Sequence, residues 1–282
     1  MTEPFVGSEA LHKGLVRKHQ LRSRCRAVFP DVYVRRDLEP TLRQRPQAAW
    51  LWSHRRGVIA GLTAAHWHGA KWVDACLPVE LIWSNARPPR GIKTYDMRLE
   101  PDEFRVVAGL PVTTPQRTAF DIGRRKPIDA AVARLDALAA ATGIKVVEVA
   151  ELADRHRGAR GMRQLGTALD LVDTGSQSPK ETWLRLVLIR EGLPRPTTQI
   201  PVITDRGQVY YLDMGWAELM VAAEYDGEHH RLDRWQYRKD IERSEALERL
   251  GWIVIRVTAT DRPPDIVRRV RDAREYRASS LR

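Results

Sequence analysis

Hydrophobic and polar positions in the first 75 residues follow first a helical and then a strand spacing. Residues 9–25 have helical spacing with basic side chains on the polar positions, and residues 29–36 (FPDVYVRR) alternate like two short strands around a Pro-Asp turn. Further helices are predicted at 42–55 and 59–68. Helices combined with a β-ribbon in this length are compatible with a winged helix-turn-helix, which we predict over residues 1–75.

The middle of the chain, residues 76–175, mixes strand and helix spacing. Residues 77–83 (LPVELIW) predict a strand, and residues 109–125 predict a strand that runs into a helix. Thr114 is the expected N-cap of that helix because a proline at the first helical position follows it. Residues 173–179 (DTGSQSP) have the composition of a linker and mark a domain boundary. Three more helices are predicted, at 129–141, 146–155 and 162–172.

Residues 176–282 predict a third domain with the element order αβββαβα. A helix beginning at Ser178 is followed by three strands, a polar helix over 233–250, the apolar strand GWIVIRVT and an arginine-rich helix from Pro264 to about Tyr276. The overall fold class is therefore α/β (α+β), with a winged helix-turn-helix, a middle α/β region and a C-terminal αβββαβα domain.

Composition narrows the class of protein. Hydrophobic residues make up 43% of the 282 residues, enough for packed cores. No apolar run approaches the roughly 18 residues of a membrane span, and the N-terminus lacks the layout of a secretory signal. The two cysteines exclude a disulfide framework and a cysteine-based zinc site. We expect a cytoplasmic protein with no membrane partner.

Charge favours a polyanionic partner. Lysine and arginine number 47 against 36 acidic residues, for a net charge of +11, and residues 1–80 alone carry +6. Such an excess favours nucleic acid, although a merely basic surface explains it too. The candidate DNA contacts of the N-terminal domain are Arg17, Lys18, Arg22 and Arg24.

Acidic residues inside apolar strands form the strongest candidate site. Asp213 lies within YYLDMGW, Glu224 and Asp226 end VAAEYDG, and Glu181 opens the preceding helix. Carboxylates in such strands are unfavourable unless something pairs with them. A turn at residues 217–218 would place Asp213 beside Glu224, and the resulting cluster suits Mg²⁺ or Mn²⁺. A metal held there can activate water against a phosphodiester.

Each of these acids also has a purely structural interpretation. Glu181 can complete a capping box with Ser178, Asp213 can pair with an arginine, and Asp226 can belong to a turn with Gly227. Each structural interpretation is favoured for its residue alone. The joint occurrence of these acids favours a functional site.

Basic residues surround the acids in the sequence. His229 and His230 can act as general acid or base, or can lie in a solvated loop. Lys239 and Arg243 lie on a predicted helix, where they either neutralise a DNA backbone or form exposed ion pairs with residues one turn away. Arg256 lies in an apolar strand and would need an acidic or phosphate partner if it faces inward.

Residues 178 to about 258 resemble the PD-(D/E)xK nuclease superfamily, and more closely the DUF559 domain related to very-short-patch-repair endonucleases. The matching runs are SPKETWLRLVLIREGLPRPTTQIPV, YLDMGW, VAAEYDGEHH and YRKDIERSEALERLGWIVIRVT. The resemblance implies a restriction-endonuclease-like fold for this domain. It also implies that Glu181, Asp213 and Glu224 bind the metal and that histidines after the strand, here His229 and His230, take part in catalysis. The usual lysine of the superfamily falls at Asp226, which is a departure.

The first two domains resemble the N-terminal regions of AbiEi-like proteins, the antitoxins of type IV toxin–antitoxin systems. The matching pieces are VFPDVYV, VIAGLTAAHWHGA and GLPVTTPQRTAFDIG. This resemblance implies a winged helix that binds DNA and represses its own operon.

Two functions of different classes follow. The first is a Mg²⁺- or Mn²⁺-dependent DNA endonuclease that the winged helix targets, in which Asp226 assists the metal ligands and Lys239, Arg243 and Arg256 contact phosphates. The alternative is a catalytically inactive, antitoxin-like transcriptional repressor with a cognate toxin as partner. An RNA substrate and a homodimer stay open.

Overall fold

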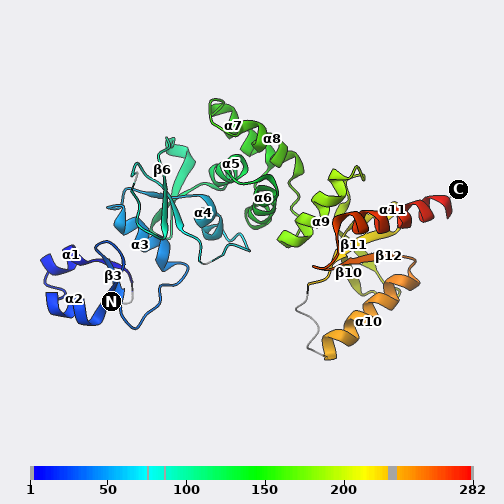
Figure 1. Cartoon of the computed structure of the whole chain (residues 1–282), viewed down its shortest axis with the longest axis horizontal. Helices are drawn as coiled ribbons and strands as arrows, with labels where there is room; N and C mark the ends of the chain where they lie inside the picture. The colour runs from blue at the N-terminus through cyan, green and yellow to red at the C-terminus, as the bar shows by residue number, and fades with distance from the viewer. Residues whose placement is uncertain (1–2, 75, 86, 228–233, 281–282) are drawn as a thin grey trace. The chain divides into compact units, whose positions relative to one another are not determined.

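The computed structural model describes residues 3–74, 76–85, 87–227 and 234–280. Contacts between residues divide the chain into two compact units, residues 1–169 and residues 170–282 (Figure 1). None of the helices in these described ranges is long and apolar enough to cross a membrane.

The first unit opens with two short helices and a small antiparallel sheet. Gly14, with a φ of 65°, follows the end of the first helix in the left-handed region, where glycine is favoured. The single helix expected over 9–25 is therefore wrong, whereas the strand pair around Pro30 and Asp31 is confirmed. The elements are β1 (Phe5–Val6), α1 (Gly7–His12), α2 (Lys18–Arg24), β2 (Cys25–Phe29) and β3 (Val32–Arg35), with the sheet order β1-β3-β2.

A five-stranded mixed sheet forms the centre of the first unit. Its order is β6-β5-β4-β8-β7, and Ile59, Leu81 and Val112 from its central strands are buried in one core with Val32 of the small sheet. One sheet therefore takes strands from both sides of the boundary expected at residue 75. The strands are β4 (Val58–Ile59), β5 (Val79–Ile82), β6 (Ile92–Tyr95), β7 (Phe104–Val107) and β8 (Leu110–Thr113).

Helices complete the first unit. Thr114 caps α5 as predicted, since its side chain accepts a hydrogen bond from the Arg117 N–H. Gly143 ends α6 in the left-handed conformation. The helices are α3 (Gln44–Trp52), α4 (Gly61–Trp67), α5 (Pro115–Arg125), α6 (Ile128–Thr142), α7 (Val146–Arg155) and α8 (Met162–Leu171), the last of which crosses into the second unit.

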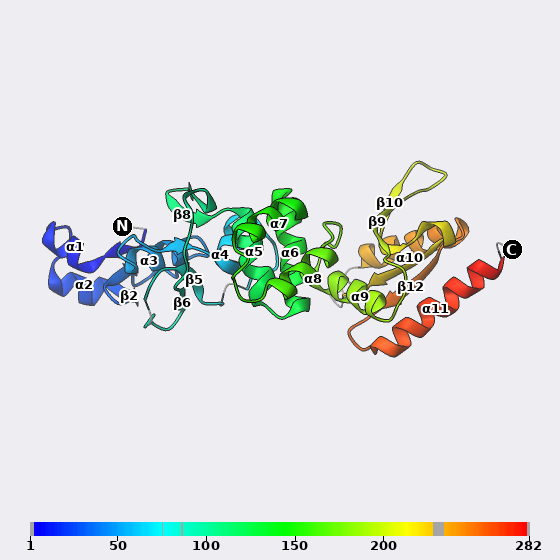
Figure 2. The same ribbon diagram turned by 90° about the horizontal axis from the view of Figure 1, so that it is seen from above.

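The second unit is a four-stranded sheet with helices on both faces (Figure 2). Its strands lie in the order β12-β11-β10-β9, and β11 and β12 are parallel because α10 connects them. Residues of α9 and α11 share a core with Met214, whereas Leu247 of α10 packs against Leu212. The elements are α9 (Pro179–Arg190), β9 (Thr197–Ile203), β10 (Val209–Trp216), β11 (Val221–Tyr225), α10 (Arg234–Arg249), β12 (Ile253–Val257) and α11 (Pro263–Ser280), which is the predicted αβββαβα order.

A buried ion network holds α5 of the first unit against the edge of its sheet. Arg117 is 2% exposed and its Nε donates to Asp121 Oδ2 at 3.0 Å, while its Nη1 donates to Glu103. Glu103 and Asp121 are fully buried. Asp121 also pairs with Arg124, and Glu103 also pairs with His156. Arg117 is the cation that contacts both buried carboxylates, so we expect it to stabilise this region.

We expect Arg117→Met to lower the free energy of unfolding by about 3–5 kcal/mol, because two buried carboxylates lose their shared partner. Urea unfolding at neutral pH measures this change. Arg157→Met is the matched control, since Arg157 is exposed and pairs with an exposed aspartate, and we expect it to shift stability by less than about 0.5 kcal/mol. Equal effects of the two substitutions would contradict a structural role for the network.

Candidate carboxylate site and basic helix

The pairing of β10 with β11 brings two of the predicted acids together. Met214 pairs with Ala223, so Asp213 and Glu224 lie at the next position along the two strands. In the parallel pairing of β11 with β12, Glu224 lies opposite Arg256. Glu181 lies in the first turn of α9, close enough to both other acids for their charges to act on one another. The structure therefore gathers Glu181, Asp213 and Glu224 as the sequence predicts.

Glu181 also caps the start of α9. Ser178 Oγ accepts a hydrogen bond from the Glu181 N–H at 3.1 Å, and Glu181 Oε2 accepts one from the Gln177 N–H at 2.7 Å. The capping role predicted for Glu181 is therefore confirmed. The Glu181 side chain accepts its backbone hydrogen bond from Gln177, the residue before the N-cap Ser178. Burial raises the pKa of the Glu181 carboxyl, and the nearby charge of Glu224 raises it further.

Asp213 is the most strongly perturbed acid of the cluster. Burial, followed by the charges of Glu181 and Glu224, raises its pKa to about 7, although its Oδ2 accepts a hydrogen bond from the Tyr225 N–H at 2.9 Å. Asp213 therefore changes charge near neutral pH, unlike an ordinary aspartate.

Glu224 is held by an arginine. Arg243 of α10 donates from Nη1 to Glu224 Oε2 at 2.8 Å and from Nη2 to Glu224 Oε1, so the ion pair is bidentate. Arg243 Nη2 also donates to the Tyr211 carbonyl oxygen at 2.9 Å. The hydrogen bonds to Glu224 raise the pKa of Arg243. A DNA phosphate would therefore have to compete with the Glu224 carboxylate for the guanidinium of Arg243.

A cavity of about 340 Å³ opens over these strands. Arg256, at its wall, is exposed and donates to Ser244 Oγ, so it faces the cavity rather than the core. Asp226, at the position of the usual superfamily lysine, is exposed in the same cavity. The lining residues are Asp213, Glu224, Tyr225, Asp226, Asp240, Arg243 and Arg256.

The arrangement does not fit a divalent metal ion. Among residues 3–74, 76–85, 87–227 and 234–280, no group of three or more histidine, cysteine, aspartate or glutamate side chains is placed to hold one. The reason is visible at Glu224, both of whose oxygens accept hydrogen bonds from Arg243. Mg²⁺ and Mn²⁺ need several oxygen ligands turned to one point.

Other predicted residues of this site are placed differently. His229 and His230 lie outside the described residues. Lys239 is exposed on α10 and does not line the cavity. Asp240, which the sequence analysis did not select, does line the cavity because it precedes Arg243 by less than one turn of the same helix. The helical spacing of Asp240 and Arg243 was the signal that could have identified it.

The basic residues of the N-terminal helix form a second candidate site. Arg17, Lys18, Arg22 and Arg24 are all exposed, and α2 contains no acidic residue. Arg36 holds the end of α2, since it donates to the carbonyl oxygens of Arg22, Ser23 and Cys25. This capping role could not be read from the sequence, because Arg36 follows the end of β3 and its partners lie more than ten residues earlier in the chain.

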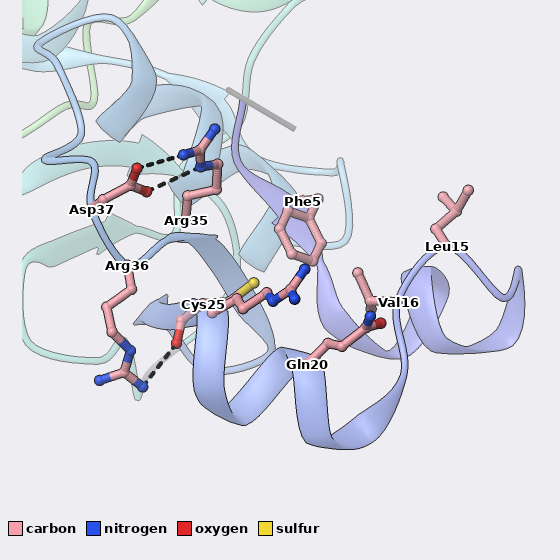
Figure 3. A pocket seen from close by; sticks show the side chains of 9 residues that line it. Phe5, Leu15, Val16, Gln20, Cys25, Arg35, Arg36 and Asp37 are labelled. Atoms are coloured by element: carbon pink, nitrogen blue, oxygen red, sulfur yellow. Dashed lines mark hydrogen bonds and ion pairs between the residues drawn. The ribbon is translucent and has the colours of Figure 1, made fainter.

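Beside α2 lies a cavity of about 650 Å³ (Figure 3). Phe5, Leu15 and Val16 form an apolar part of its wall, and an ion pair between Arg35 and Asp37 lies at another part. Cys25, which is buried, lies between them. The remaining lining residues are Gln20, Arg24 and Arg36.

Comparison with known proteins finds similarity over part of the chain. Residues 57–174 match the AbiEi antitoxin C-terminal domain. The chain is also 29% identical over 155 residues to two Mycobacterium tuberculosis proteins, the uncharacterized protein MT2308 of strain CDC 1551 / Oshkosh and the uncharacterized protein Rv2248 of strain ATCC 25618 / H37Rv. These matches cover 55% of this chain and 57% of each relative.

The domain match supports the AbiEi-like part of the sequence interpretation. It ends at residue 174, close to the boundary between the two units. An antitoxin-like domain fits the alternative function, a DNA-binding antitoxin, better than it fits a nuclease. The endonuclease resemblance of the second unit stays a hypothesis.

The raised pKa of Asp213 predicts a pH-dependent effect of Asp213→Asn. The pKa of Asp213 in the folded protein lies above its ordinary value, which applies in the unfolded chain. Near pH 4 this difference costs the folded wild type almost nothing. As the pH rises from 4 towards 7, the free energy of unfolding of wild type falls. We expect the variant to be more stable than wild type by about 2–4 kcal/mol at pH 8, and nearly equal at pH 4.5.

Urea unfolding of both proteins at the two pH values measures this difference. Asp205→Asn is the control, because Asp205 is exposed in the turn between β9 and β10, and we expect it to have no pH-dependent advantage. Equal stabilities of wild type and Asp213→Asn at pH 8 would show that burial and the neighbouring carboxylates do not raise the pKa of Asp213.

Proposed function

We propose that this protein is a DNA-binding regulator of the antitoxin type. The observation that carries the proposal is the match of residues 57–174 to the AbiEi antitoxin C-terminal domain. The net charge of +11 supports DNA as the ligand. Under this proposal a cognate toxin is the protein partner.

The N-terminal elements supply a suitable DNA-binding module. α1 and α2 are joined by a short turn and followed by the β2–β3 ribbon, the order of a helix-turn-helix with a wing. In such modules the second helix enters the major groove. Lys18 and Arg22 are one turn apart on α2, so they lie on the same face of that helix. Both are exposed, as Arg24 is.

Arg22 and Arg24 support α2 as the DNA-contacting helix, because their side chains form no ion pair with a carboxylate among the described residues. Arg35 and Arg55 are each engaged with a carboxylate, Asp37 and Glu9 respectively. No ion pair is found for Arg22 or Arg24 among the described residues of the chain, so their charge is available to phosphates. Neutralising phosphates releases condensed counterions and makes the affinity depend on salt.

We expect Arg22→Ala with Arg24→Ala to weaken binding to the DNA that precedes the protein's own gene. If both side chains contact phosphate, the slope of log affinity against log salt falls by about 2 in magnitude. Fluorescence anisotropy with a labelled duplex at several salt concentrations measures both effects. The protein with Arg157→Ala, which removes one exposed charge elsewhere in the first unit, should keep the wild-type slope. A slope unchanged in the double variant would remove α2 from the interface.

A metal-dependent endonuclease is the second candidate function. The observation that favours it is the gathering of Glu181, Asp213 and Glu224 on α9, β10 and β11. The bidentate contact of Arg243 with Glu224 and the presence of Asp226 in place of lysine favour the first proposal instead. His229, His230, Lys239 and Arg256 belong to this candidate as proton-transferring or phosphate-contacting residues.

Incubation with supercoiled plasmid and with single-stranded DNA distinguishes the two functions. Under the antitoxin proposal we expect no cleavage in Mg²⁺ or Mn²⁺, by wild type or by Asp213→Asn, while salt-sensitive binding persists. Cleavage by wild type that Asp213→Asn abolishes would establish the nuclease instead. Equal cleavage by both would indicate a contaminating nuclease and would count against the carboxylate site.

A further inference from the structure

Four carboxylates line the cavity of the second unit, and one of them, Glu224, is buried. Asp213, Glu224, Asp226 and Asp240 line it, and Glu181 lies beside it. Glu224 is only 8% exposed. A carboxylate that is buried to this extent requires a cation close by, since the interior solvates charge poorly.

Arg243 meets this requirement with three directed hydrogen bonds. Two go to the two oxygens of Glu224 on β11, and the third goes to the Tyr211 carbonyl oxygen on β10. The guanidinium carbon also lies 5.8 Å from the ring centre of Tyr210. The side chain of Arg243 therefore joins the two central strands of the sheet at the position of the carboxylates.

The helix that carries Arg243 is fixed by the core. Leu247, one turn later on α10, is buried in a cluster with Ile200 and Leu212 of the sheet. Residues one turn apart share a helix face, so burying Leu247 directs Arg243 to the sheet as well. Guanidinium keeps its charge at every pH at which proteins fold, and its planar fork matches the two carboxylate oxygens.

We infer that Arg243 is the resident cation of the carboxylate cavity and takes the place that the resemblance to PD-(D/E)xK nucleases assigns to a divalent metal. The side chains that line the cavity then have a structural role, because the ion pair between Arg243 and Glu224 holds α10 on the sheet. This inference goes beyond the proposed DNA binding and does not depend on it, because it concerns contacts within the second unit alone.

The first test asks whether the wild-type protein responds to metal. We expect 10 mM MgCl₂ or MnCl₂ at pH 8 to change its melting temperature by less than about 1 °C, relative to the same ionic strength of NaCl, because no metal is bound. A stabilisation by MnCl₂ that rises and saturates with concentration would overturn the inference. That result would leave the proposed DNA binding of the first unit untouched.

The second test removes the arginine. We expect Arg243→Met to lower the melting temperature of the second unit by about 5 °C or more, because Glu224 loses its cation. Arg238→Met is the matched control on the same helix, since Arg238 is exposed and pairs only with exposed Glu242 among the described residues. Its melting temperature should stay within about 1 °C of wild type. Equal melting temperatures of the two variants would overturn the inference.

A double variant separates charge compensation from simple packing. Adding Glu224→Gln to Arg243→Met removes the unpaired charge, so we expect at least half of the lost melting temperature to return. Arg243→Lys, which keeps the charge and loses the bidentate fork, should lie between wild type and Arg243→Met. A double variant that is less stable than Arg243→Met would show that Arg243 acts through packing alone, contrary to the inference.

Discussion

The fold of the second unit depends on one bidentate ion pair, between Arg243 and Glu224. The four-stranded sheet is apolar on the face that meets α9 and α11, and Leu247 covers part of the face that meets α10. Glu224 lies on β11, in the interior of this sheet, where an uncompensated charge would be strongly unfavourable. The packing of α10 over the sheet is therefore stabilised by the cation that it brings to Glu224, which is Arg243.

The first unit solves the same physical problem in the same way. Glu103 and Asp121 are fully buried and Arg117 lies between them. Arginine suits both places because its several donors satisfy two acceptors at once and because it does not lose its charge on burial. The arginines of the chain thus have two roles. Some neutralise buried carboxylates inside the two units, and others form an exposed positive surface on α2.

The sequence predicts the parts of this arrangement that follow from periodicity. Asp213 and Glu224 interrupt two apolar strands joined by a tight turn, so their proximity follows from antiparallel pairing. The cap of α5 by Thr114 is equally local. The break between α1 and α2 was missed because Lys13 and Leu15 continue the helical pattern around Gly14. The partner of Glu224 could not be predicted because Arg243 lies 19 residues away on a helix whose charges look like ordinary exposed pairs.

Charge compensation also bears on the relation between fold and activity in this protein. A cluster of carboxylates that is left without an internal cation stays strained and attracts a metal ion, and catalysis can use that strain. A carboxylate that is paired with a fixed guanidinium, as Glu224 is with Arg243, attracts a metal ion less strongly. The αβββαβα order and the three acids are therefore compatible both with a nuclease and with a domain that has no catalytic role. In the conformation described, the guanidinium of Arg243 contacts both oxygens of Glu224, and this contact stabilises the second unit at the position of the carboxylates.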